Sequence, residues 1–221
     1  MICLSQEAAT KIERLTIAGP AGNLEALLEW DPKWSPRLLA LVCHPHPLYG
    51  GTMHNKVTFR AAKAAANSGV PALRFNFRGV GQSQGKFADG LGEREDARAA
   101  LRYLGERFPN LPVSMMGFSF GSVVALAVGS AQREVNSLAG IGVPAGSADF
   151  EFLQQIRKPK LIVQGTQDSF GPRAKVEALF ASLEEPKSLH FVEDVDHFFT
   201  GKLAELQSVI EEFLGGILEG L

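Results

Sequence analysis

The chain has 221 residues, of which 45% are hydrophobic and 21% charged, as in an ordinary soluble globular protein with a substantial core. Its net charge of −2 gives no general reason to bind nucleic acid or an anionic membrane surface. Two cysteines, Cys3 and Cys43, are too few for a disulfide framework. Residues 1–10 lack the pattern of a signal peptide and the apolar runs are too short to span a membrane, so we expect a cytoplasmic protein.

From the N-terminus onward, the apolar pattern predicts a β-hairpin at residues 14–18 and 24–30, followed by alternating strands and helices. Further strands are expected at residues 38–43, 71–77, 113–116, 135–143, 160–164 and 188–192, and helices at residues 56–68, 93–108, 119–132, 173–183 and 202–218. This alternation predicts an α/β fold with a mostly parallel central sheet, helices on both faces and the antiparallel hairpin at one edge. We expect one domain over residues 1–221 without a large lid domain.

Reactive side chains follow four of the predicted strands. Ser119, in the pentapeptide Gly-Phe-Ser-Phe-Gly, Asp168 and His197 each follow a different strand, and His44 and His46 follow another. In open α/β sheets, sites form at the carboxyl ends of the strands. We therefore expect these groups to meet at one edge of the sheet.

Three of these groups have complementary chemistry. The hydroxyl of Ser119 needs a base to remove its proton, which the imidazole of His197 could do. Asp168 would fix the tautomer of that imidazole and stabilise its protonated form. Gly117 and Gly121 leave the room that a sharp strand–serine–helix turn requires, and the chain order Ser, Asp, His is the one expected for this architecture.

Each assignment has a competitor. Ser119 could simply cap the following helix. His190 competes with His197, but it lies inside a predicted strand, where its side chain is committed to one face of the sheet. Three acidic residues compete with Asp168: Glu193, Asp194 and Asp196.

The histidines after the first parallel strand offer a second interpretation. His44, His46 and His54 include an H-x-H pattern that recurs in metal-dependent hydrolases, so a metal-dependent hydrolase that uses His44 and His46 is an alternative. Because carboxylate partners at later strand ends are sparse, we expect no metal, and we expect His44 to hold its loop through hydrogen bonds.

A glycine-rich segment, GVGQSQG at residues 79–85, is similar to a dinucleotide fingerprint but is one residue too long. We expect no cofactor there. Arg78 and Asp96 are instead expected to pair and brace this turn.

Five segments together resemble the small, lidless bacterial α/β-hydrolases related to dienelactone hydrolase. They are HPHPLYGGTMHNK (44–56), LRFNFRGVGQSQG (73–85), GFSFG (117–121), QGTQD (164–168) and DHFFTGKL (196–203). The resemblance implies Ser119, Asp168 and His197 as a catalytic triad. Dienelactone hydrolase itself uses a cysteine nucleophile where this chain has serine.

An oxyanion hole requires two backbone N–H donors. The first is expected at Phe120, directly after the serine. Because Pro45 and Pro47 have no N–H, the second donor is either His46 or Leu48. The placement of this donor in the related hydrolases favours His46.

We expect a small apolar pocket beside the serine. Its predicted lining residues are Leu48, Tyr49, Phe118, Phe170 and Phe198. The sequence thus predicts a serine hydrolase that acts on small ester or other acyl substrates through an acyl-enzyme, without a cofactor. The alternative from another class is a hydrolase fold that serves as a binding or scaffold protein. The sequence leaves the oligomeric state open, a homodimer included.

Overall fold

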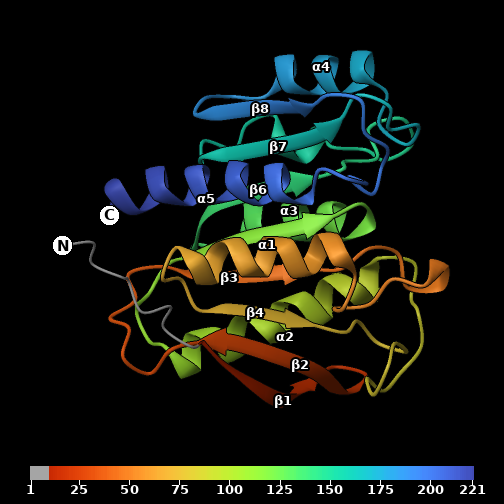
Figure 1. Ribbon diagram of the computed structural model, residues 1–221. Helices are drawn as coiled ribbons and strands as arrows, with labels where there is room; N and C mark the ends of the chain where they lie inside the picture. Colours follow the sequence, from red (N-terminus) through yellow and green to blue (C-terminus); the bar gives the residue numbers. More distant parts are fainter. Residues whose placement is uncertain (1–9) are drawn as a thin grey trace.

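The computed structural model describes residues 10–221, in which eight strands form a single sheet in the order β1-β2-β4-β3-β5-β6-β7-β8 (Figure 1). The strands are β1 (Lys11–Gly19), β2 (Gly22–Trp30), β3 (Leu39–Cys43), β4 (Ala72–Phe75), β5 (Val113–Phe118), β6 (Val135–Ile141), β7 (Lys160–Gly165) and β8 (Lys187–Val192). The hairpin β1–β2 is antiparallel, and β2 also pairs antiparallel with β4. All the other neighbours pair parallel. The predicted fold class and the edge position of the hairpin are confirmed.

Helices cover both faces of the sheet. They are α1 (Lys56–Asn67), α2 (Leu91–Arg107), α3 (Phe120–Ala131), α4 (Arg173–Ser182) and α5 (Leu203–Glu219), with two short 3-10 turns, η1 (Pro47–Tyr49) and η2 (Glu151–Leu153). In Figure 1, α1 and α5 lie side by side in front of the sheet, whereas α2 and α3 lie behind it. No helix within residues 10–221 is long and apolar enough to cross a membrane.

Two apolar layers hold these helices to the sheet. One layer joins the sheet to α2, α3 and α4, and the other joins it to α1 and α5. Every residue of β3, β5 and β7 is buried, as expected for parallel strands that are covered on both faces. Cys43 belongs to this core, where burial raises the pKa of its thiol, and Cys3 lies outside the described residues.

The strand β4 ends earlier than predicted, at Phe75 instead of residue 77. Beyond Phe75, residues 76 and 77 hydrogen-bond to the loop after β3. The backbone N–H of Phe77 donates to Nε2 of His44 at 3.0 Å, and the amide oxygen of Asn76 accepts from the backbone N–H of Met53. These bonds tie the loop after β4 to the loop after β3, near the carboxyl edge of the sheet.

The predicted brace between Arg78 and Asp96 is present. The Arg78 guanidinium contacts the fully buried Asp96 carboxylate at 2.7 Å, and the backbone N–H of Arg78 donates to the same group. Hydrogen bonding to Asp96 raises the pKa of Arg78. The glycine-rich turn beside it includes Gly79 and Gly85, whose positive φ angles of 75° and 86° suit a tight loop.

Candidate active site

Ser119 occupies a sharp turn between β5 and α3. Its φ of 55° and ψ of −123° lie outside the regions that a residue with a side chain ordinarily adopts. At two points around the turn, the backbone of one segment lies very close to a glycine of another. A Cβ atom on Gly117 would lie 2.0 Å from the carbonyl oxygen of Gly121, and one on Gly121 would lie 2.4 Å from the carbonyl oxygen of Cys43. A side chain at either position would clash with the backbone, so both residues must be glycine. The side chain of Ser119 projects from the end of the strand.

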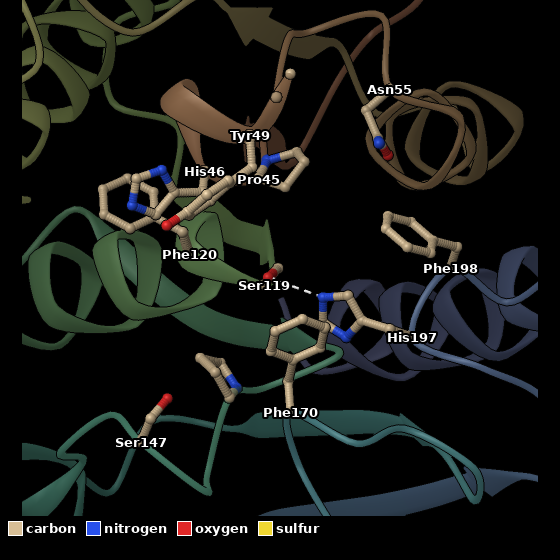
Figure 2. Close-up of a pocket in the computed structure, with 13 residues that line it drawn as sticks. Pro45, His46, Tyr49, Asn55, Ser119, Phe120, Ser147, Phe170, His197 and Phe198 are labelled. Carbon is tan, nitrogen blue, oxygen red and sulfur yellow. Dashed lines mark hydrogen bonds between the residues drawn. The ribbon is translucent and has the colours of Figure 1, made fainter.

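The structure brings the three predicted catalytic side chains into one chain of hydrogen bonds. Nε2 of His197 lies 2.9 Å from the hydroxyl oxygen of Ser119, a contact drawn as the dashed line in Figure 2. Nδ1 of the same ring lies 2.6 Å from Oδ2 of Asp168. The competitor His190 lies on β8 and contacts Glu205 of α5 instead.

Asp168 is buried and surrounded by donors. Its Oδ1 accepts from the backbone N–H groups of Phe170 at 2.8 Å and Gly171 at 3.3 Å. Its Oδ2 accepts from Nε2 of Gln164 at 2.7 Å, in addition to the contact with His197. These bonds fix the orientation of the carboxylate beside His197.

The competing carboxylate of Asp196 has another role. It accepts from the backbone N–H of Phe198 and from both the N–H and the hydroxyl of Thr200. The bond from the Thr200 backbone lowers the pKa of Asp196. Asp196 thus organises the turn that presents His197.

Aromatic rings surround the imidazole of His197. The Phe118 ring, which is completely buried, has its centroid 4.9 Å away, and the Phe170 ring lies at 4.6 Å on the cavity side. The Phe198 ring approaches edge-on at 5.4 Å. These contacts hold the ring in the plane that reaches both Ser119 and Asp168.

A cavity of about 310 Å³ opens beside Ser119 (Figure 2). Three predicted pocket residues line it: Tyr49, Phe170 and Phe198. Two predictions are wrong. Phe118 is fully buried beneath His197, because it is the last residue of β5 and points into the core, and Leu48 is 67% exposed outside the cavity.

Other lining residues were not singled out from the sequence. They are Pro45, Gly50, Gly51, Asn55, Pro144 and Ser147. Asn55 also caps α1, since its side-chain oxygen accepts from the backbone N–H of Val57 at 2.9 Å. An asparagine before an alanine-rich helix is a recognisable cap, but the path of the loop that turns it toward the cavity is a tertiary property.

The loop after β3 contains the two predicted alternatives for the second oxyanion donor. The backbone N–H of Leu48 donates to Nδ1 of His46 at 3.2 Å, while the carbonyl of His46 accepts from Tyr49 and Gly51. Since the backbone N–H of Leu48 is already engaged, the geometry favours the N–H of His46 as the second oxyanion donor. Burial lowers the pKa of His46, whose ring packs against Phe120.

His44 holds this loop, as predicted. Its Nδ1 lies 2.6 Å from the carbonyl oxygen of Pro45, and its Nε2 accepts from the backbone N–H of Phe77. Burial lowers the pKa of His44 to about 4. Both ring nitrogens are thus engaged with the backbone, and within residues 10–221 no group of three or more His, Cys, Asp or Glu side chains is arranged to hold a metal ion.

Comparison with known proteins places this geometry in a family. The profile of the alpha/beta hydrolase domain matches residues 49–211. A Rickettsia prowazekii protein, itself uncharacterized, is 38% identical over 206 residues, which cover 89% of this chain and 86% of that protein.

Two solved structures agree with this placement. An alpha-beta serine hydrolase homologue from Coxiella burnetii has 38% identity and a TM-score of 0.86, over 91% of this chain and 97% of that one. A Xanthomonas campestris member of the α/β serine hydrolases without a lid has 35% identity and a TM-score of 0.84, over 92% and 94%. The chain described here therefore belongs to the α/β-hydrolase family.

Proposed function

We propose that this protein is a serine hydrolase that cleaves small carboxylic esters. The observation that carries the proposal is the continuous contact from Ser119 through His197 to Asp168, directly beside a cavity. The similarity to α/β serine hydrolases supports the reaction class.

In the proposed reaction, the Ser119 oxygen attacks the ester carbonyl carbon while Nε2 of His197 takes the hydroxyl proton. Asp168 stabilises the resulting imidazolium. The imidazolium then returns the proton to the leaving alcohol, and an acyl-enzyme remains. Water, deprotonated by His197, hydrolyses that ester and releases the acid with Ser119 regenerated.

The negative charge of the tetrahedral intermediate needs donors on the opposite side of the carbonyl. We assign this role to the backbone N–H of Phe120 at the first position of α3 and to that of His46. An N–H in the first turn of a helix has no partner within the helix, and the helix dipole adds to its attraction for an anion.

The shape and lining of the cavity favour a small apolar acyl or aromatic group. Its volume of about 310 Å³ lies at the low end for ligand sites. The rings of Tyr49, Phe120, Phe170 and Phe198 supply most of an apolar wall, whereas Asn55 and Ser147 add polar groups.

A fluorophosphonate probe tests the proposal. The wild-type protein is expected to be labelled and to hydrolyse a short nitrophenyl ester, and Ser119→Ala is expected to lose the labelling and about 10⁶-fold in kcat. Ser130→Ala is the matched control, because Ser130 lies on the same helix and its hydroxyl bonds to the carbonyl of Ala127. An unlabelled wild type would favour the scaffold alternative.

A further inference from the structure

The side chain of Gln164 is a fully buried amide at the end of β7. Its oxygen accepts from the backbone N–H of Val143 at 2.8 Å. Its nitrogen donates to Oδ2 of Asp168 at 2.7 Å and to the carbonyl oxygen of Gly171 at 3.1 Å. A single side chain therefore connects the loop after β6, the loop after β7 and the acid.

The chemistry of the partners fixes the orientation of this amide. The Val143 N–H can only donate and the Gly171 carbonyl can only accept, so the nitrogen must face Asp168. Gly171 also approaches the amide closely, since a Cβ atom there would lie 2.4 Å from Nε2 of Gln164 and 2.2 Å from the carbonyl oxygen of Val143.

The position of the bond on Asp168 is informative. Oδ2, which receives the Gln164 N–H, is also the oxygen that contacts Nδ1 of His197. A second donor at that oxygen restricts the rotation of the carboxylate about its terminal bond. The amide thus holds Oδ2 where the imidazole can reach it.

The opposite end of the amide reaches the cavity wall. Val143 precedes Pro144, and Pro144 and Ser147 both line the cavity. The same two loops meet again where the backbone N–H of Gly146 donates to the carbonyl of Phe170 at 3.0 Å. Gln164 therefore fixes the position of Asp168 relative to the cavity wall formed by the loop after β6.

We propose that Gln164 is a positioning residue for ester hydrolysis: its amide fixes Asp168 against His197 and ties the acid loop to the cavity wall. This inference rests on the proposed function, since it assigns Gln164 a role in that reaction. Gln164 itself does not line the cavity.

The first test is Gln164→Met, which keeps the length of the side chain and removes its donors and acceptor. Displacement of a catalytic group by about 1 Å can cost about 100-fold in rate. We expect kcat for a short nitrophenyl ester to fall by about that factor with KM nearly unchanged, and the rate of fluorophosphonate labelling to fall in parallel.

The second test is Gln164→Glu, which keeps the acceptor for the Val143 N–H. Burial next to the Asp168 carboxylate raises the pKa of the introduced carboxyl well above its usual range. Below that pKa the protonated carboxyl can still donate to Asp168, whereas above it two carboxylates repel each other. The ratio of wild-type to variant kcat/KM is therefore expected to rise as the pH rises.

Gln207→Glu is the matched control for the second test. Gln207 lies on α5 and does not line the cavity, and its side-chain nitrogen also donates to a carboxylate, Oε1 of Glu211 at 2.9 Å, while its oxygen accepts from Arg60 at 3.0 Å. It has no contact with Asp168. The ratio of wild-type to Gln207→Glu activity is expected to stay constant with pH.

The outcomes separate this inference from the proposed function. If wild type is not labelled by the fluorophosphonate, the proposed function fails. If wild type is labelled and the Gln164 variants match its rates, or if the Gln164→Glu ratio does not change with pH, only the positioning role is overturned. Should Gln164→Met not fold, the pH dependence of Gln164→Glu decides alone.

Discussion

At the scale of single residues, His44 links the site to the stability of the protein. Its neutral ring donates from Nδ1 to Pro45 and accepts at Nε2 from Phe77, so a second proton would break the latter bond. Burial lowers its pKa from 6.5 to about 4. The unfolded chain therefore binds a proton at this histidine before the folded protein does.

This difference predicts a loss of stability in acid. Between pH 6.5 and 4 the unfolded state binds more protons, so the contribution of His44 is complete above pH 6.5 and is lost as the pH falls toward 4. The loss amounts to about 3 kcal/mol. Urea unfolding of His44→Gln, whose amide does not titrate, should show a correspondingly shallower pH dependence.

The exposed His54 on the same loop supplies the control, since His54→Gln should keep the wild-type pH dependence. Equal slopes for wild type and His44→Gln would contradict the assignment.

The close packing around Gly117 and Gly121 leads to a second prediction, about the stability of the protein. Gly121→Ala would force a Cβ atom against the carbonyl oxygens of Cys43 and His44, both at 2.4 Å. We expect the free energy of unfolding to fall by about 3 kcal/mol. By contrast, Gly105→Ala, at an exposed position of α2 with nothing within 4 Å of the new atom, should raise it by up to about 1 kcal/mol. Denaturant unfolding of both variants measures the difference, and a tolerated Gly121→Ala would contradict it.

At the scale of elements, the ion pair between Arg78 and Asp96 joins the loop after β4 to α2. Removal of one partner leaves the other charge without compensation, and the Asp96 side chain is fully buried. We predict that Arg78→Ala lowers the free energy of unfolding by about 3 kcal/mol. Thermal unfolding checks this, with Arg173→Ala as the control.

The control is informative because Arg173 also contacts carboxylates, those of Glu177 and Glu193, but at the surface. Loss of exposed pairs has little effect, so its melting temperature should not change measurably. An equally small effect for Arg78→Ala would contradict a stabilising role for the Arg78–Asp96 ion pair.

At the scale of the whole molecule, the sheet order places β5 between β3 and β6, so the loops that surround Ser119 come from distant parts of the chain. The cavity is small, and no lid domain covers it within residues 10–221. We predict the highest kcat/KM for nitrophenyl esters with the shortest acyl chains. Rates measured over a series from acetate to long-chain esters test this, and a preference for the long chains would contradict it.

Much of this organisation could be predicted from the sequence, because periodicity and turn residues report on local structure. Ser119, Asp168 and His197 follow strands, so their convergence could be predicted from the topology. Gln164 could not be assigned, although a polar residue in the apolar run Leu-Ile-Val-Gln-Gly is a signal of a satisfied buried group. Its partners at Val143 and Gly171 depend on how two loops pack.

The same limit explains the errors in the pocket. Phe118 and Phe170 are both phenylalanines close to the proposed triad in the sequence. Composition cannot show that the Phe118 ring is buried on one side of the imidazole, whereas the Phe170 ring faces the cavity on the other. The direction of Phe118 follows from its place at the end of β5, whereas that of Phe170 follows from a loop held by Asp168.

The position of His197 between the rings of Phe118 and Phe170 has a magnetic consequence. Protons near the face of a benzene ring are shielded by the circulating π electrons. With ring centroids at 4.9 and 4.6 Å, the carbon-bound protons of this imidazole should resonate upfield of those of the exposed His54. Proton NMR can therefore follow the proposed base separately from an exposed histidine.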